Sequence, residues 1–318
     1  MMCEVRKRVA IVLTLAGILS CAATSHAQMP IAVPDGYATQ NGGTTGGGSA
    51  EPIVVSTASA FQAAVKGDTP AVIIVKGKVD LGGNVSIGSN KTIIGADTGS
   101  GLGGGSIRIN GCNYILQNLT FGPAKGDVME ISGAKNVFIT KCEFYGCTDE
   151  LCSIVRGADF VTVSWCKFYF PDTHAHAFGS LVGNSDRATG DRGKLHVTMH
   201  HNWYADGVRG RMPRVRFGHV HLYNNYYNSL GSGYCIGVGF ECNIRLENSV
   251  FENVKQPWAD YGGKDNGKIG WADLKFVDCS EPTFMPNAFP VFTPPYEYTM
   301  EPAGRVKEIV TKGAGNVR

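Results

Sequence analysis

Arginine is concentrated in one short segment of the chain, RGRMPRVRFGHVHLYNNYYN at residues 209–228. Arg209, Arg211, Arg214 and Arg216 fall within eight residues, directly before an aromatic and Asn-rich run that is typical of a strand. Each guanidinium carries a permanent charge and a planar fork of N–H donors that fits a carboxylate or a phosphate. The cluster therefore favours a site for a polyanion, and a solvated basic edge is the alternative.

The net charge limits which polyanion this is. The full chain has 29 basic and 27 acidic residues, and the first 27 residues hold three of the basic ones and one of the acidic ones. The remainder carries 26 of each and has no net charge. A neutral protein with one local arginine cluster is not a general nucleic-acid binder, because its positive charge is focused at one place. We therefore expect no nucleic-acid partner.

The first 27 residues are typical of an export signal. Residues 6–8 are basic, residues 9–20 are mostly apolar, and Ser25-His26-Ala27 offers a cleavage site before Gln28. The apolar run is short for a membrane span. We expect a signal peptide at 1–27 and a secreted protein with no membrane attachment. A lipobox-like sequence that ends at Cys21 leaves lipoprotein processing as the alternative.

Eight cysteines follow the predicted signal. An even number in an exported protein permits disulfides. The short loops make Cys147–Cys152 and Cys235–Cys242 the simplest pairs, but the sequence does not fix the connectivity. None of the eight lies in a CxxC or His/Cys cluster that would indicate zinc.

The elements that must position the arginines are short β-rich runs. From residue 71 onward, runs such as AVIIV, VFITKCEF and HVHLYNNYY alternate with Gly, Asn and Asp. When they are aligned, one position recurs at steps of 24, 24, 36, 23 and 23 residues: Asn118, Cys142, Cys166, Asn202, Asn225 and Asn248. A short strand motif at a fixed period indicates a solenoid, and β-branched and aromatic runs favour a β-helix coil. Asparagine at one turn position suits the left-handed backbone and hydrogen bonds between coils.

The remaining segments are predicted to flank this solenoid. Residues 41–49 are Gly-rich and indicate a flexible linker or a surface loop. Ser56–Lys66 has the cap and the apolar face of a helix that covers one end of the solenoid. The single step of 36 places an insertion of about 12 residues in a loop around Pro171–Arg192, on the binding face. The Pro-rich segment from residue 285 predicts a cover over the C-terminal end, with a short helix at Ala303–Thr311.

Several long segments resemble the extracellular pectate lyases of polysaccharide lyase family 1. The segments are GDVMEISGAKNVFITKCEF, DELCSIVRGADFVTVSWCKF, LVGNSD and HHNWYADGVRGRMPRVRFGHVHLYNNYY, in this order. The match spans roughly residues 50–255. The resemblance implies an all-β fold, a single right-handed parallel β-helix over residues 28–318 with a short N-terminal capping helix and a loop-rich C-terminal cover. It also implies β-elimination of α-1,4-linked polygalacturonate, with calcium as the cofactor, by a protein that we expect to be a monomer.

The resemblance assigns roles to particular residues. Arg211 matches the family's catalytic base, which removes the proton from C5 of the sugar, and Arg216 matches the arginine that binds the substrate carboxylate. Arg209 and Arg214 would add positive charge and bind substrate beside them. Asp127 and Asp149 match calcium ligands. They lie 22 residues apart, about one coil, so adjacent turns place them side by side.

The chain departs from the family pattern at three places. A third calcium-ligand position, usually Asp, is Ser153, and a fourth is Lys125. We therefore expect weak calcium binding that improves when substrate carboxylates complete the coordination. The usual substrate-binding lysine is missing before LVGNSD. His176 or His174 takes its role, or the longer loop makes no such contact.

Two alternatives remain. A calcium-independent pectin lyase would act on neutral, methyl-esterified pectin, and the loss of acidic ligands favours it. Asp127, Asp149 and four arginines favour a charged substrate instead. A non-catalytic carbohydrate-binding β-helix protein would not need Arg211 and Arg216 at these positions. A β-helix hydrolase would need paired catalytic carboxylates, and no such Asp-rich cluster occurs on the coils.

Overall fold

A computed structural model describes residues 30–172, 176–262, 267–280, 282 and 288–317. The predicted signal peptide at 1–27 lies outside the described residues. From Ile31 onward the described residues belong to one compact unit.

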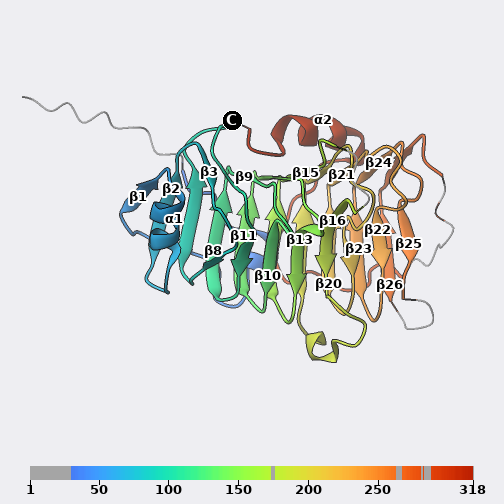
Figure 1. The fold of residues 1–318 in the computed structure, drawn as a ribbon. Helices are drawn as coiled ribbons and strands as arrows, with labels where there is room; N and C mark the ends of the chain where they lie inside the picture. Colours follow the sequence, from blue (N-terminus) through green and yellow to red (C-terminus); the bar gives the residue numbers. More distant parts are fainter. Residues whose placement is uncertain (1–29, 173–175, 263–266, 281, 283–287, 318) are drawn as a thin grey trace, which may run out of the picture. The chain divides into compact units, whose positions relative to one another are not determined.

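The unit is a parallel β-solenoid in which each coil contributes one short strand to each of three sheets (Figure 1). Each strand pairs in parallel with the equivalent strand of the coils before and after it. The all-β solenoid predicted from the repeats is confirmed.

We name the three sheets A, B and C. Sheet A holds ten strands in the described residues: β1 (Pro52–Val55), β2 (Ala71–Val75), β5 (Lys91–Gly95), β8 (Cys112–Gln117), β11 (Lys135–Thr140), β14 (Asp159–Ser164), β17 (His196–His200), β20 (His219–Tyr223), β23 (Asn243–Glu247) and β26 (Lys268–Ala272). Sheet C holds eight: β4 (Val85–Ile87), β7 (Ile107–Ile109), β10 (Met129–Ser132), β13 (Glu150–Val155), β16 (Phe178–Val182), β19 (Arg214–Val215), β22 (Ile236–Val238) and β25 (Trp258–Asp260). Sheet B holds nine: β3 (Lys78–Asp80), β6 (Gly101–Gly103), β9 (Thr120–Phe121), β12 (Glu143–Tyr145), β15 (Lys167–Tyr169), β18 (Trp203–Tyr204), β21 (Tyr226–Tyr227), β24 (Val250–Glu252) and β27 (Lys275–Val277).

Inside the solenoid, like side chains stack from coil to coil. The rings of Phe144 and Phe168 lie 5.0 Å apart, and those of Tyr204 and Tyr227 lie 5.2 Å apart, close to the spacing of neighbouring strands. The buried members of these stacks belong to one continuous apolar cluster. This core fixes the axial position of every coil, because a residue that points inward on one coil must meet its equivalent on the next.

The corners after the later strands of sheet A, from β8 to β26, use the left-handed backbone conformation. Seven residues in register have φ between 43° and 54°: Asn118, Lys141, Trp165, His201, Asn224, Asn248 and Asp273. Asparagine tolerates this region better than most residues.

The predicted column of stacked residues therefore mixed two adjacent positions. Asn118 and Asn248 belong to the left-handed column, and Cys142, Cys166, Asn202 and Asn225 lie one residue further on. In that second column Asn225 Oδ1 accepts from the Asn202 backbone N–H at 2.9 Å. The Asn202 side chain accepts from the Cys166 N–H at the same distance. Side-chain amides do connect neighbouring coils as predicted, but the predicted column was displaced by one residue at its two ends, Asn118 and Asn248.

Two segments before the first full coils cover the solenoid. Helix α1 (Ala58–Val65) begins at the Thr57 cap, and it buries Phe61 and Val65 against the N-terminal end of the core, as predicted. The Gly-rich segment 41–49 is a surface segment on sheet A rather than a flexible linker. Asn113 Oδ1 accepts the N–H groups of Thr45 and Gly46 at 2.7 Å each. Nearby lies a short 3-10 turn, η1 (Gly36–Thr39).

The predicted insertion loop is not all loop. Residues 178–182 of that segment form β16, which pairs with β13 and β19 inside sheet C. The extra length lies mainly between β16 and β17, where a 3-10 turn, η2 (Thr189–Asp191), occurs. The repeat length showed that residues were added, but it did not show that a strand lies among them.

The C-terminal segment runs back along the side of the solenoid instead of covering its end. Tyr296 and Glu301 contact sheet A residues Thr198 and Asn224. Helix α2 (Ala303–Gly313) then buries Val306 and Val310 against sheet B (Figure 1). The predicted helix is confirmed, and the described part of the predicted C-terminal cover lies along sheets A and B.

All eight cysteines after the predicted signal are free thiols in the described residues. The proposed pairs Cys147–Cys152 and Cys235–Cys242 are therefore wrong. Neither of the two α-helices in the described part of the chain is long and apolar enough to cross a membrane.

The amide ladder makes a prediction about stability. The buried Asn225 side chain accepts from Asn202 N–H and donates to the Met199 carbonyl at 2.9 Å. Asn225→Ala leaves both backbone groups buried without partners and should lower the free energy of unfolding by about 2–4 kcal/mol. Urea denaturation measures the change. Asn110→Ala, at an exposed position, is the control, and an equal loss in both variants would contradict the role of the ladder.

Candidate active site

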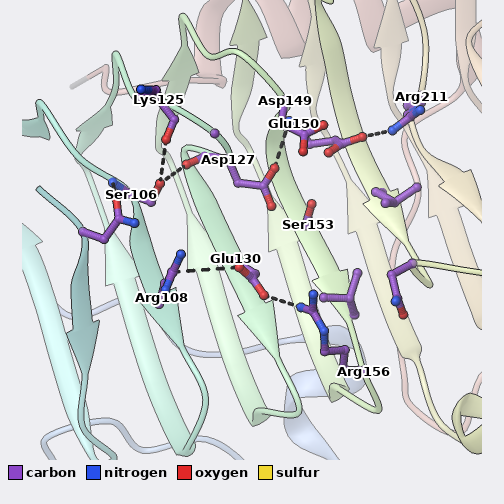
Figure 2. Close-up of a pocket in the computed structure, with 15 residues that line it drawn as sticks. Ser106, Arg108, Lys125, Asp127, Glu130, Asp149, Glu150, Ser153, Arg156 and Arg211 are labelled. Atoms are coloured by element: carbon purple, nitrogen blue, oxygen red, sulfur yellow. Dashed lines mark hydrogen bonds and ion pairs between the residues drawn. The ribbon is translucent and has the colours of Figure 1, made fainter. Parts of the chain in front are cut away.

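The outer face of sheet C carries a groove of about 430 Å³ (Figure 2). Its lining comes from six successive coils and is polar and charged: Asn84, Ser106, Arg108, Lys125, Gly126, Asp127, Glu130, Asp149, Glu150, Ser153, Val155, Arg156, Leu181, Asn184 and Arg211. Because neighbouring residues in the groove come from neighbouring coils, the groove runs across the strands.

The ladder of sheet C aligns outward-facing residues into rows. Glu130 on β10 lies between Arg108 on β7 and Ser153 on β13. The same row continues to Leu181 on β16 and Arg214 on β19. The next residue of β19, Val215, is fully buried, which confirms that Arg214 lies on the outer face.

Acidic groups form the centre of the groove, where the turns before β10 and β13 lie side by side. Asp127 Oδ1 accepts the backbone N–H of Glu150 at 3.0 Å. Burial raises the pKa of Asp127 from 3.8 to about 6, against the hydrogen bond from the Ser153 hydroxyl, which lowers it. The nearby Asp149 carboxylate raises it further. A partly buried carboxylate beside a second, exposed one is a favourable environment for a cation.

Glu150 connects this acidic centre to the arginine segment. Its carboxylate, nearly fully buried, forms an ion pair with Nη1 of Arg211. The Arg211 guanidinium also lies over the ring of Phe178, 4.2 Å from its centroid. Charge pairs in such buried positions break at a high cost unless another charge replaces the lost partner. The Glu150 carboxylate therefore fixes the position of the Arg211 guanidinium.

The backbone holds Arg211 in an unusual conformation. Its φ is 55°, in the left-handed region that costs energy for residues other than glycine. Its carbonyl accepts from Ser180 on β16, and the next N–H, of Met212, bonds to the Cys235 carbonyl beside β22. The turn that carries Arg211 is thus fastened to the coils on both sides.

The four arginines of the sequence cluster do not converge on one point. Arg214 stacks over Tyr261 at 4.5 Å and extends past Gly237, where a Cβ would come within 2.9 Å of the Arg214 side chain. Burial lowers the pKa of Arg214, and the charges of Arg216 and Arg211 act in the same direction.

The other two arginines have partners outside the groove lining. Arg216 is largely buried, pairs with Asp186, and donates to the Gly183 carbonyl at 2.9 Å. Arg209 lines a separate depression beside Asp172 and Asp206. Of the four, only Arg211 lies in the groove lining itself.

A possible metal-binding group lies at the junction of these elements. Asp149, Glu150 and His176 each offer a ligand atom, and these atoms lie within 4.8 Å of one another. His176 Nε2 also lies 3.1 Å from Asp149 Oδ1. Together with Asp127, the set is rich in carboxylate oxygens, which suits a hard divalent cation such as calcium.

The predicted site residues are thus partly brought together. Asp127, Asp149, Ser153 and Arg211 line one groove, and His176 contacts Asp149. Ser153 hydrogen-bonds to the Asp127 carboxylate. Asp186 forms an ion pair with Arg216.

Sequence reasoning missed two features of the groove, the Glu150–Arg211 pair and the charged cluster of Arg108, Glu130 and Arg156. The period of the repeats placed Arg108 and Glu130 one coil apart, and a search for charges at that spacing would have found them.

Three comparisons place the chain among known proteins. A family model described as pectate lyase matches residues 8–315. A probable pectate lyase B of Aspergillus terreus is 34% identical over 278 residues, which cover 81% of this chain and 82% of that protein. A pectate trisaccharide-lyase of Bacillus licheniformis is 32% identical over 302 residues, 88% of this chain and 85% of that one.

Solved structures agree on the fold. A pectate lyase bound to a hexasaccharide has a TM-score of 0.76 at 22% identity and covers 93% of this chain and 99% of its own. A Bacillus pectate lyase in complex with trigalacturonate has a TM-score of 0.75 at 27% identity, with 89% and 98% covered.

The buried Asp127 makes a prediction about pH. Its folded pKa, about 6, lies above the unfolded value of 3.8, so its contribution to stability is full below pH 3.8 and is lost as the pH rises through 6. In chelator, Asp127→Asn should therefore raise the free energy of unfolding at pH 8 by about 1–3 kcal/mol. The gain should vanish near pH 4. Urea denaturation at both pH values measures it, and a gain that does not depend on pH would contradict the assignment.

Proposed function

The chain belongs to the pectate lyase family and is a polysaccharide lyase, and from this premise we propose that it cleaves polygalacturonate by calcium-assisted β-elimination in the groove over sheet C. The observation that carries this proposal is the junction at Glu150. It joins the carboxylates of Asp127 and Asp149, which suit a cation, to Arg211, the matched catalytic base.

The chemistry requires this combination. Each sugar of the substrate bears a carboxylate, and elimination removes the proton from the adjacent C5 and expels the oxygen at C4. Negative charge builds on the sugar carboxylate in the transition state, so cationic groups that are already in place there lower the barrier. A groove that joins a cation-binding acidic centre to arginines can supply them.

Arg211 is proposed to accept the C5 proton. It must first leave Glu150, because a guanidinium that is paired with a carboxylate holds its proton. Alkaline solution favours the neutral guanidine that a base requires. Arg216 and Arg214 are proposed to bind substrate carboxylates on the same side of the groove. Arg216 is already oriented for this by Asp186 and by the Gly183 carbonyl.

Asp127 and Asp149 are proposed to hold the calcium ion, with Glu150 as a further ligand. A bound calcium would neutralise the substrate carboxylate and polarise it. Ser153, predicted as a ligand, is proposed to orient Asp127 through its hydroxyl. His176, predicted to bind substrate, lies close enough to Asp149 to be displaced when a cation binds there. Weak calcium binding by the free protein remains the expectation.

The activity is tested by the absorbance of the unsaturated product. Polygalacturonate at alkaline pH with calcium should give product, and chelator should reduce the rate to background because the acidic centre then lacks its cation. Arg211→Lys should lower kcat by at least about 100-fold. Arg192→Lys, at an exposed arginine that pairs with Glu241 outside the groove lining, is the control.

Other outcomes would assign a different function. Product from highly methylated pectin alone, unaffected by chelator, would indicate a pectin lyase. No product from either substrate would indicate a carbohydrate-binding protein without catalysis.

We also propose that residues 1–27 are removed on export and that the mature protein is a secreted monomer. N-terminal sequencing of the secreted protein should begin at Gln28. An intact Met1 would contradict this, and a lipidated Cys21 would indicate lipoprotein processing. Light scattering of the same sample should give the mass of one chain.

A further inference from the structure

A second charged cluster lies along the side of the groove opposite the acidic centre, further down the strands (Figure 2). The Glu130 carboxylate lies between two guanidinium groups. Arg156 donates to its Oε1, and Arg108 Nε lies 4.0 Å from its Oε2. The side chains of Arg108 and Arg156 are 52% and 57% exposed, whereas that of Glu130 is 23% exposed. Glu130 therefore orients two arginines whose remaining donors are open to the groove.

This cluster has a surplus of positive charge. Two guanidinium groups share one carboxylate, and Lys125 lines the same groove one coil from Arg108. Exposed ion pairs contribute little to stability, so the fold does not require this arrangement. An arginine fork with unused donors binds a carboxylate in two parallel hydrogen bonds. The cluster can therefore accept a carboxylate from a ligand.

Its place relative to the acidic centre is fixed by the sheet. Arg108 lies on β7, two strands before β13, which begins at Glu150. At about 4.8 Å per strand, the distance across the sheet is roughly 10 Å. One pyranose residue is about as long as one strand spacing, so Arg108 lies about two sugars from Glu150 and about four from the turn before β19 that carries Arg211.

The shape of the substrate makes a second set of cations useful. Successive sugars of a polyuronate are rotated about the chain, so their carboxylates point to different sides. The turns before β10 and β13 carry Asp127 and Asp149 on one side of the groove. Figure 2 shows Arg108, Glu130 and Arg156 along the other side, further down the strands. A sugar that turns its carboxylate away from the acidic centre meets this second side.

We propose that Arg108 and Arg156 form a distal subsite that binds the carboxylate of a uronate sugar away from the cleavage point. The proposal rests on the proposed function, because the ligand is the same polyuronate chain. The subsite adds affinity only for substrates long enough to reach it. It makes the enzyme prefer long acidic oligosaccharides and fixes their position in the groove.

The test compares substrates of two lengths. Arg108→Gln and, separately, Arg156→Gln should raise KM for heptagalacturonate by about five- to tenfold and leave kcat within about twofold. Both constants for trigalacturonate should stay within about twofold of the wild type. Arg192→Gln is the matched control, because Arg192 is a similarly exposed arginine paired with Glu241 outside the groove lining. Arg192→Gln should change neither KM nor kcat for either substrate.

Three results would overturn the proposal: an equal loss for both lengths, no loss for either, or the same loss in Arg192→Gln. Thermal unfolding of each variant identifies one that does not fold, and Arg156→Lys, which keeps the charge, then replaces Arg156→Gln and should retain most of the affinity for the heptamer.

Binding measurements separate this proposal from the proposed function. If the wild type forms no unsaturated product, the proposed function fails. Calorimetric titration with heptagalacturonate still tests the subsite, because Arg108→Gln should weaken binding about five- to tenfold and Arg192→Gln should not. Equal affinity of Arg108→Gln and the wild type would then overturn the subsite itself.

Discussion

The parallel pairing of one coil with the next is the constraint on which the rest of this molecule depends. Every strand of sheet C is aligned by its backbone ladder, so a residue at a given position on one coil lies beside the same position on the next. Residues about 22 to 36 positions apart thereby become neighbours on one surface. The groove is built in this way, and a change that shifted one coil by a residue would turn its groove side chains into the core.

The solenoid also holds charged side chains in partly buried positions, which are unfavourable for charge. Asp127 is partly buried beside Asp149, and burial together with the neighbouring carboxylates raises its pKa. Glu150 and Arg211 are buried as a pair, and the left-handed backbone at Arg211 adds local strain. The aromatic and aliphatic stacks inside the solenoid form one continuous core, and the stability of this core offsets these unfavourable contributions. A regular core therefore permits an irregular, strained and highly charged outer face.

The parts of this structure that could be predicted from sequence are those that repeat or that carry local signals. The strand period, the helix capped at Thr57 and the helix at Ala303 follow from local patterns. The column of stacked residues was misplaced by one residue at Asn118 and Asn248, because Asn suits both of two adjacent corner positions. Strand β16 was hidden inside an insertion, since only pairing with β13 and β19 shows that it is a strand.

At the groove, too, the sequence predicts individual residues but not the contacts between them. A motif identifies Arg211 and Asp127, but the partner that orients Arg211 is Glu150, 61 positions earlier, and only the stacking of coils brings the two together. The sequence cluster of four arginines also overstated the positive charge at one point, because Arg209 and Arg216 have separate surroundings. The stacked coils instead place basic and acidic side chains in alternation along the groove. Arginines lie on both sides of the acidic centre, because Arg108 and Arg156 flank Glu130 on one side and Arg211 pairs with Glu150 on the other.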